Sequence, residues 1–329
     1  MRRFGLARSC ALCLALVAAP AAAQTLQPSK PIRIIVPYAP GGLTDVVARL
    51  YSEQLRQSLG RGVFVENKPG ASGIVAIEEM ARARGDGHTL MIGNISTNGL
   101  TPVLLAKKLK IDYERDVQVI TPLADVPVFF LATTTNFPPQ TFGEFLAHAK
   151  EHPGKVRYGS AGIGSYQQIN IEIFAKRNGL ELVHIPFKGG GSEIIRDLAN
   201  GDIHVSFFNV TNPVGMMKAG RVRALAIASA GRLPQHAEVP TFDELGHSGV
   251  RASQWVAAFA PVAVPAEITD VLRKAFTDVM AAPEMRQAFT RGDMVVPRQT
   301  WLADPKTWLR EEMAAWKRDI EAAGITVEE

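Results

Sequence analysis

Short apolar runs alternate with amphipathic segments along most of the chain. Six such runs lie at residues 31–37, 63–65, 89–92, 155–158, 182–185 and 203–208. Each is followed by a short loop rich in Gly, Ser, Thr, Asn or Pro, such as 93–99, and most of these loops lead into apolar residues at helical spacing. The first helix is expected to bury Leu43, Val46, Val47 and Leu50. Strands that alternate with helices predict parallel sheets covered by helices on both faces.

The six strand–loop–helix units form two groups of three. Between the groups, residues 121–135 are apolar and contain proline, and we expect a strand at 126–132 that crosses from one lobe to a second. A return crossing is expected at 223–228, and helices near 269–280 and 306–323 are expected to pack back on the first lobe. This arrangement predicts two lobes, the first built from 24–126 and 229–329 and the second from 127–228.

The N-terminus has the pattern of a secretory signal peptide. Three arginines precede an apolar run at 11–19, and three alanines follow at 21–23. We therefore predict a signal peptide over residues 1–23 and a periplasmic location, with a buried N-terminal helix as the alternative. The apolar run is too short to span a bilayer, and no later segment keeps about 18 apolar residues in a row, so no stable membrane insertion is expected.

Removal of this segment changes the composition that matters for function. Both cysteines, Cys10 and Cys13, lie inside it, so the remaining chain has no thiol for a disulfide, a nucleophile or a metal ligand. Of the 36 basic residues, 33 remain against 32 acidic ones, a net charge of +1. This balance argues against nucleic acid and anionic membranes as partners, so any preference for an anion must come from a local site.

The loops have the composition of an anion-binding site. Ligands of open parallel sheets bind beyond the carboxyl ends of the strands, where these loops would meet. Glycine lets backbone N–H groups approach an anion, and the N-terminus of a helix favours negative charge. Asp45 is interpreted first as a partner of the helix dipole, and Lys188 either as a carboxylate contact or as a solvated lysine.

Catalytic and cofactor motifs are missing from the sequence. HExxH, GxSxG and GxxxxGK[ST] do not occur, and the seven histidines are not spaced as metal ligands. The glycines of 159–164 stand in the wrong order for a dinucleotide-binding loop. We therefore expect no cofactor, no metal and no enzymatic activity.

Six segments in order resemble one known family, the substrate-binding proteins of tripartite tricarboxylate transporters, also called Bug receptors. They are residues 34–45, 66–73, 86–90, 158–165, 185–191 and 239–246. The resemblance implies an α/β, two-lobed type II periplasmic-binding-protein fold. In this fold, each lobe is a mainly parallel sheet flanked by helices, and two crossing strands join the lobes.

The resemblance also implies a function and a set of site residues. A monomeric receptor would capture a small carboxylate and deliver it to a membrane permease; a receptor that signals to a sensor kinase and an exported enzyme are the alternatives. The loop 38–45 would contact one end of the ligand and the loop 160–165 the opposite carboxylate. The expected ligand-binding residues are Tyr38, Ala39, Pro40, Gly41, Gly42, Thr44, Asp45, Ala71, Ser72, Ser96, Ser160, Gly162, Gly164, Ser165, Lys188, Gly189 and Asn209.

Overall fold

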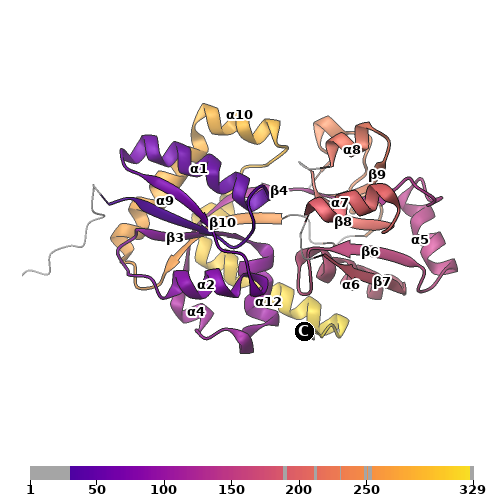
Figure 1. Ribbon diagram of the computed structural model, residues 1–329, viewed down its shortest axis with the longest axis horizontal. Coiled ribbons are helices and arrows are strands. Elements are labelled where there is room, and N and C mark those ends of the chain that lie inside the picture. Colours follow the sequence, from indigo (N-terminus) through magenta and orange to yellow (C-terminus); the bar gives the residue numbers. More distant parts are fainter. Residues whose placement is uncertain are drawn as a thin grey trace, which may run out of the picture.

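Two five-stranded sheets lie side by side in the computed structural model of the chain (Figure 1). The structure describes residues 30–187, 191–210, 213–229, 231–247, 250 and 254–326, so the predicted signal peptide lies outside the described residues. The first sheet has the order β2 (Val63–Asn67), β1 (Ile32–Val36), β3 (Thr89–Asn94), β10 (Gln254–Pro261) and β4 (Val117–Val126). The second has the order β7 (Leu182–Pro186), β6 (Val156–Ser160), β8 (Val205–Asn209), β5 (Val128–Thr133) and β9 (Val222–Ala228).

Both sheets follow the same plan. In the first sheet β10 runs antiparallel to β3 and β4, while β1 pairs with β2 and β3 in parallel. In the second sheet β5 runs antiparallel to β8 and β9, while β6 pairs with β7 and β8 in parallel. In each sheet the one reversed strand occupies the fourth place. The predicted two-lobed α/β fold is confirmed, and each sheet is mixed, with two parallel and two antiparallel pairings.

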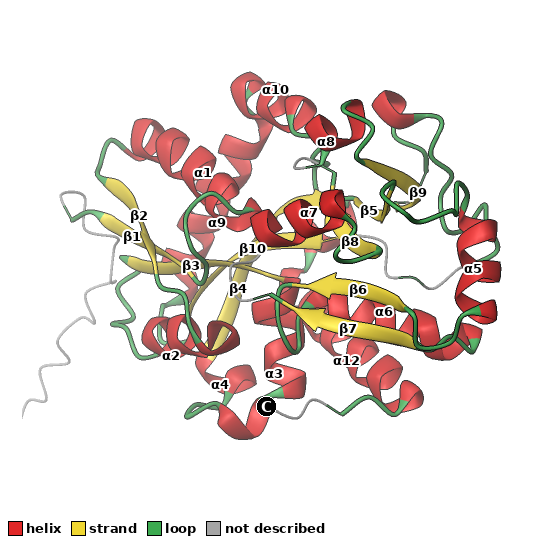
Figure 2. Cartoon of the chain, turned by 45° about the vertical axis from the view of Figure 1, so that its right-hand side comes forward, coloured by secondary structure: helices red, strands yellow, loops and turns green. Residues whose placement is uncertain are grey.

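Helices cover both faces of the sheets, as Figure 2 shows. The α-helices are α1 (Leu43–Leu59), α2 (Ile74–Ala81), α3 (Thr101–Leu104), α4 (Tyr113–Asp116), α5 (Phe142–Glu151), α6 (Tyr166–Asn178), α7 (Gly191–Asn200), α8 (Val214–Lys218), α9 (Ala266–Ala281), α10 (Pro283–Arg291), α11 (Gln299–Ala303) and α12 (Pro305–Ala323). Short helical turns are η1 (Ala71–Gly73), η2 (Ile95–Leu100), η3 (Ala106–Lys108) and η4 (Pro234–His236). The prediction of a loop at 93–99 is therefore wrong in part. The π-helical turn η2 begins at Ile95, and β3 extends to Asn94.

The chain crosses between the sheets differently from the prediction. A continuous strand at 126–132 is wrong: β4 ends at Val126 and β5 begins at Val128, so Pro127 separates two strands of different sheets. Proline interrupts the ladder because it has no N–H to donate. The predicted return crossing at 223–228 is also wrong, because β9 is an edge strand of the second sheet. The return to the first sheet comes after it, between β9 and β10.

Helix α1 shows how the apolar pattern positions a helix. Val47, Tyr51 and Leu55 recur on one face and are buried, and the helix ends at Gly60, which has the left-handed backbone that favours glycine. The Tyr51 ring lies 5.7 Å from that of Phe276 on α9. Val46 was predicted on the buried face, but it is 44% exposed. The buried stripe of α1 is therefore narrower than predicted.

Helix α12 contacts both lobes, as Figure 1 shows, where its yellow C-terminal half extends towards α6. In its first half, the Trp308 ring lies 5.0 Å from that of Trp255 on β10. In its second half, Asp319 Oδ1 lies 2.9 Å from Arg177 Nη2 on α6. The prediction that this helix packs on the first lobe is thus correct for one half only.

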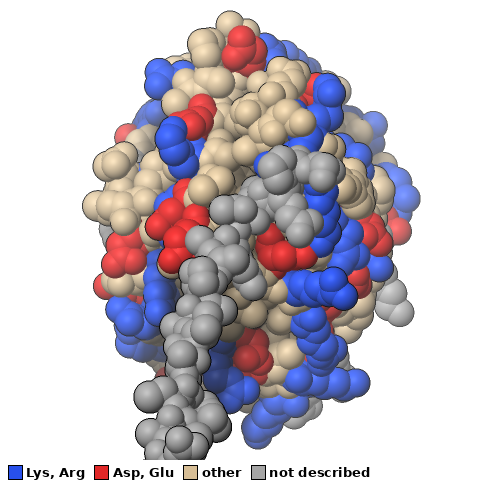
Figure 3. All heavy atoms as spheres, turned by 90° about the vertical axis from the view of Figure 1, so that its left-hand side faces the viewer, with Lys and Arg blue, Asp and Glu red and all other residues tan. Residues whose placement is uncertain are grey.

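Basic and acidic side chains are mixed on the surface at the outer end of the first lobe. Figure 3 shows Lys and Arg side chains lying among Asp and Glu side chains, with the basic ones more numerous along the lower right edge. This mixture agrees with the small net charge expected after removal of the N-terminal segment. Within the part of the chain that the structure describes, no helix is both long and apolar enough to cross a membrane.

Candidate functional site

The predicted loops lie at the carboxyl ends of parallel strands. In the first sheet β1 leads through residues 37–42 into α1, and β3 leads directly into η2. In the second sheet β6 leads through residues 161–165 into α6, and β8 ends at Asn209. Each sheet therefore contributes loops and helix N-termini of the kind that can hold an anion.

Asp45 braces the first loop from inside. It is 2% exposed, and its Oδ2 accepts hydrogen bonds of 2.9 Å from the backbone N–H of Gly41 and from Arg49 Nε. Its Oδ1 accepts a 2.8 Å bond from Asn67 Nδ2. Burial by itself would raise the pKa of this carboxyl, but the bonds from Arg49, Gly41 and Asn67 outweigh it, and the pKa is lowered. Asp45 is therefore ionised at neutral pH and holds the loop in place.

A second polar group connects this loop to η2. Asn94 Oδ1 accepts a 2.7 Å hydrogen bond from the Tyr38 hydroxyl and a 3.0 Å bond from the backbone N–H of Ser96. Asn94 Nδ2 donates a 3.0 Å bond to Thr44 Oγ1 in the first turn of α1. Burial raises the pKa of Tyr38 to about 12, so its hydroxyl stays protonated as a donor. Tyr38 and Thr44 are thus held by their neighbours.

The N-terminus of α1 carries no side-chain cap. Its N-cap residue is Gly42, which has no side chain to accept from the first-turn N–H groups, whereas Ser165 caps α6. Ala39, Pro40 and Gly41 beside it are exposed, and Gly41 has a φ of +91°, which favours glycine. Among the predicted contacts, this helix end offers backbone donors to a ligand most directly.

The turn after β2 lies against η2. Ala71 and Ser72 are exposed, and both have positive φ angles. The backbone oxygen of Ser72 accepts a 2.8 Å hydrogen bond from Thr101 Oγ1. At Gly73 an added Cβ would lie 2.5 Å from Thr97 Cγ2, so only glycine fits between the two segments. The structure therefore brings Ala71 and Ser72 next to η2, which carries Ser96.

The loop of the second lobe satisfies much of its own backbone. Ser160 is fully buried; its Oγ lies 2.6 Å from His184 Nε2 and accepts a 3.2 Å bond from Gly162 N–H. Gly164 N–H donates a 2.7 Å bond to Gln168 Oε1. Ser165 is the N-cap of α6. The side chains of Ser160 and Ser165 thus hold the loop, as Asp45 does in the first lobe.

His184 and its neighbours form the polar support behind the second-lobe loop. Burial lowers the pKa of His184, and the charge of Glu172 raises it by a smaller amount, so the ring is neutral at neutral pH. It stacks on Tyr158 at 4.9 Å, and the Tyr158 hydroxyl donates a 3.1 Å bond to Glu172 Oε1. The same carboxylate oxygen accepts a 2.7 Å bond from Gln168 Nε2. A continuous polar group therefore supports the loop from strand β7 to helix α6.

A hydrogen bond joins the two sets of loops. The backbone N–H of Tyr166, at the start of α6, donates a 3.1 Å hydrogen bond to Ser96 Oγ in η2. Asn209 is half-buried and pairs with Val128 at the point where the chain enters the second sheet. Lys188 and Gly189 lie outside the described residues.

Several residues of this site were not predicted from the sequence. They are Asn67, Asn94, Gln168, Glu172 and His184. A signal existed for Asn94, because Asn94 and Thr97, three residues apart, form a capping box at the start of η2. Gln168 and Glu172 bond to each other within α6, whereas Asn67 and His184 bond to residues on other elements, and local sequence carries no mark of such contacts. In the described parts of the chain, no group of three or more His, Cys, Asp or Glu residues is placed to hold a metal ion.

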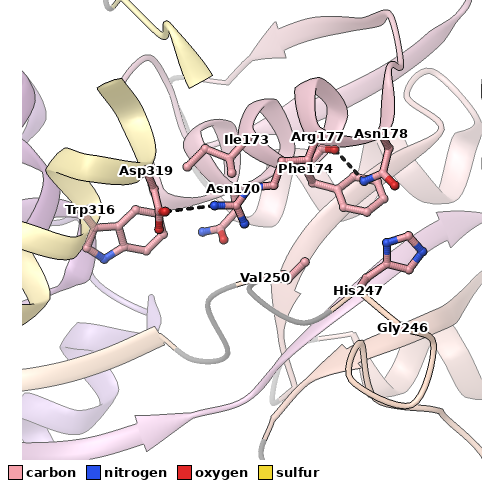
Figure 4. Close-up of a pocket in the computed structure, with 10 residues that line it drawn as sticks. All are labelled: Asn170, Ile173, Phe174, Arg177, Asn178, Gly246, His247, Val250, Trp316 and Asp319. Carbon is pink, nitrogen blue, oxygen red and sulfur yellow. Dashed lines mark hydrogen bonds and ion pairs between the residues drawn. The ribbon is translucent and has the colours of Figure 1, made fainter. Parts of the chain in front are cut away.

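A separate cavity lies beside α6, away from the loop that begins it. It has a volume of about 170 Å³ and is bounded by α6, α12 and residues near His247, as Figure 4 shows. The ion pair of Arg177 and Asp319 crosses one side of it. None of the predicted ligand-binding residues lines this cavity, so it marks the contact of α6 with α12.

Comparisons with known proteins agree on one family. The family model described as tripartite tricarboxylate transporter family receptor matches residues 47–325. The chain is 30% identical over 312 residues to the protein BugT of Bordetella pertussis, which covers 94% of this chain and 93% of BugT.

Two solved structures are similar along almost their whole length. One is MatC from Rhodopseudomonas palustris with bound malate, with a TM-score of 0.80, 29% identity, and coverage of 89% of this chain and 100% of that one. The other is the R. palustris protein Rpa4515 with adipate, with a TM-score of 0.83, 26% identity, and coverage of 91% and 99%.

Proposed function

The chain belongs to the tripartite tricarboxylate transporter receptor family, and from this premise we propose that it captures a small carboxylate between its two lobes. As a periplasmic solute-binding receptor, it delivers the bound ligand to a membrane permease. The ligand is held by the loops at the carboxyl ends of β1, β2 and β3 on one side and of β6, β7 and β8 on the other. No catalytic step is part of this function.

The observation that carries the proposal is the uncapped N-terminus of α1. Its first-turn N–H groups and the exposed segment 39–41 lie at the carboxyl end of β1, which pairs in parallel with β2 and β3. The positive end of the helix dipole and these donors favour a carboxylate, and each hydrogen bond to a charged ligand contributes about 1.5–3 kcal/mol. Asp45 and Asn94 hold the loop in the shape that presents these donors.

The charge of the ligand is matched by neutral groups. Arg49, the cation beside this loop, already donates to Asp45 Oδ2 and, over 3.1 Å, to Asn67 Oδ1. Backbone N–H groups therefore supply the recognition, and a ligand with two carboxylates can use both lobes. MatC with malate and Rpa4515 with adipate support dicarboxylates as the ligand class.

The proposed site residues divide by role. Ala39, Gly41, Gly42, Ala71 and Ser72 in the first lobe and Gly162 in the second contact the ligand, because they are exposed or half-buried at the loop surfaces. The remaining predicted contacts with buried side chains act by holding the loops. They are Thr44, Asp45, Ser160 and Ser165.

A panel of carboxylates tests this function by thermal unfolding and tryptophan fluorescence. A ligand at about 100 times its dissociation constant stabilises the folded state by about 2.7 kcal/mol, which gives a clear rise in melting temperature. We expect such a rise with one class of dicarboxylates and none with amines of the same length. If the melting curve and the fluorescence stay unchanged across the whole panel, the proposed function is wrong.

A further inference from the structure

The hydrogen bond between Tyr166 and Ser96 connects the two lobes at the ends of the proposed site. Ser96 follows β3 in the first sheet, and Tyr166 begins α6, which follows β6 in the second sheet. We propose that Ser96 is a positioning residue whose hydroxyl ties the N-terminus of α6 to the first lobe and stabilises the closed form. Its effect on ligand affinity rests on the proposed function, whereas its effect on the shape of the ligand-free protein does not.

In the first lobe, hydrogen bonds fix the position of the acceptor, Ser96. The backbone N–H of Ser96 donates a 3.0 Å bond to Asn94 Oδ1, and its carbonyl accepts a 3.1 Å bond from Thr101 Oγ1. Asn94 also donates to Thr44 in the first turn of α1. The position of the Ser96 hydroxyl is therefore fixed relative to the helix end that we assign to the ligand carboxylate.

In the second lobe, packing and helix capping fix the position of the donor, Tyr166. Tyr166 is 1% exposed, and its ring lies 6.4 Å from that of Phe207 on β8 in the same lobe. Ser165 before it has extended backbone and caps the helix, which sets the direction of the Tyr166 N–H. Because both partners are fixed inside their own lobes, the bond depends on the placement of one lobe against the other.

The energetics make this bond specific for the closed form. When the lobes separate, water can replace Ser96 as the acceptor for the Tyr166 N–H. In the closed form the Ser96 hydroxyl accepts from this N–H, so removal of the hydroxyl costs the closed form one hydrogen bond. Removal of the hydroxyl therefore shifts the balance towards the open form, and the apparent affinity for every ligand that needs closure falls by the same factor.

Small-angle X-ray scattering of the ligand-free protein tests the tie directly, with Ser96→Ala beside a matched control. The control is Thr141→Ala, because Thr141 Oγ accepts a 3.2 Å bond from Glu144 N–H at the start of α5, inside the second lobe. Both variants lose one hydroxyl that accepts from a helix N-terminus. We expect a larger radius of gyration for Ser96→Ala and an unchanged one for Thr141→Ala. Identical scattering of Ser96→Ala and the unchanged protein would overturn the proposal.

Calorimetry with malate and adipate then separates positioning from direct contact. We expect Ser96→Ala to weaken both ligands by a similar factor, about two- to tenfold, as for one lost hydrogen bond, and Ser96→Thr to restore most of the affinity. A loss confined to one ligand would show that Ser96 touches the ligand and would contradict a positioning role. If the unchanged protein binds neither these two ligands nor any other carboxylate of the panel, the proposed function is in error, and the scattering still decides whether Ser96 holds the lobes together.

Discussion

Replacement of Asp45 by alanine tests whether this residue holds the first loop or contacts the ligand. Its carboxylate accepts hydrogen bonds from Gly41 and Asn67, and each bond to a charged group contributes about 1.5–3 kcal/mol. Arg49 is 53% exposed, so its ion pair adds less than about 1 kcal/mol. Taking the lower values, we predict that Asp45→Ala reduces the free energy of unfolding by about 3–4 kcal/mol.

Urea denaturation measures this loss, and calorimetry measures ligand binding in the same variant. We expect binding to weaken at least tenfold, because Gly41 loses the acceptor that sets its position. Glu53→Ala is the matched control on α1: its carboxylate is 54% exposed and pairs only with surface groups, so no measurable loss is expected. An unchanged free energy of unfolding in Asp45→Ala, combined with lost binding, would refute the bracing role and favour direct contact with the ligand.

Three further predictions concern single sites. Ser160→Ala should weaken carboxylate binding by about 1–3 kcal/mol in calorimetry, because its buried hydroxyl holds the second-lobe loop; unchanged affinity would remove it from the site. Gly73→Ala should lower the melting temperature, since its φ is +89° and the new Cβ would lie 2.5 Å from Thr97 Cγ2, and an unaltered melting curve would contradict this. Burial, helped by the charge of Arg157, lowers the pKa of His204 from its ordinary value of 6.5 to about 4. Its Nδ1 accepts a 3.0 Å bond from the Arg157 N–H. As the pH is lowered, the unfolded chain therefore binds the proton at a higher pH than the folded protein. The free energy of unfolding from urea titrations should fall as the pH is lowered from about 6.5 to about 4, and its dependence on pH should be weaker in His204→Gln.

The alternation of apolar runs and amphipathic segments was sufficient to predict β1, β2, β3, β6, β7 and β8 and the two-lobed α/β class, but not β4 and β10. The local pattern of apolar residues indicates which side chains can be buried, but not which other elements pack against them. Val46 has the right spacing for the core, yet the neighbouring helices leave it 44% exposed. Helix α12 was assigned to one lobe because its second contact, through Trp316 and Asp319, depends on where α6 lies.

The site could be predicted at the level of loops but not of hydrogen bonds. Glycine, serine and asparagine after each strand were enough to locate the two helix ends. Several of the bonds that shape them join residues far apart in the chain, such as Asn94 with Thr44 and Ser96 with Tyr166. These pairs follow from the order of the strands and the placement of the lobes, which a linear pattern does not contain.

Mass spectrometry under native conditions, on protein purified gently from its own host, tests the central claim most directly. The account predicts a one-to-one complex whose released ligand is a small organic acid carrying one or more carboxylates. A bound cation or neutral compound in its place would contradict the view that backbone N–H groups at the N-termini of α1 and α6 hold a negatively charged ligand.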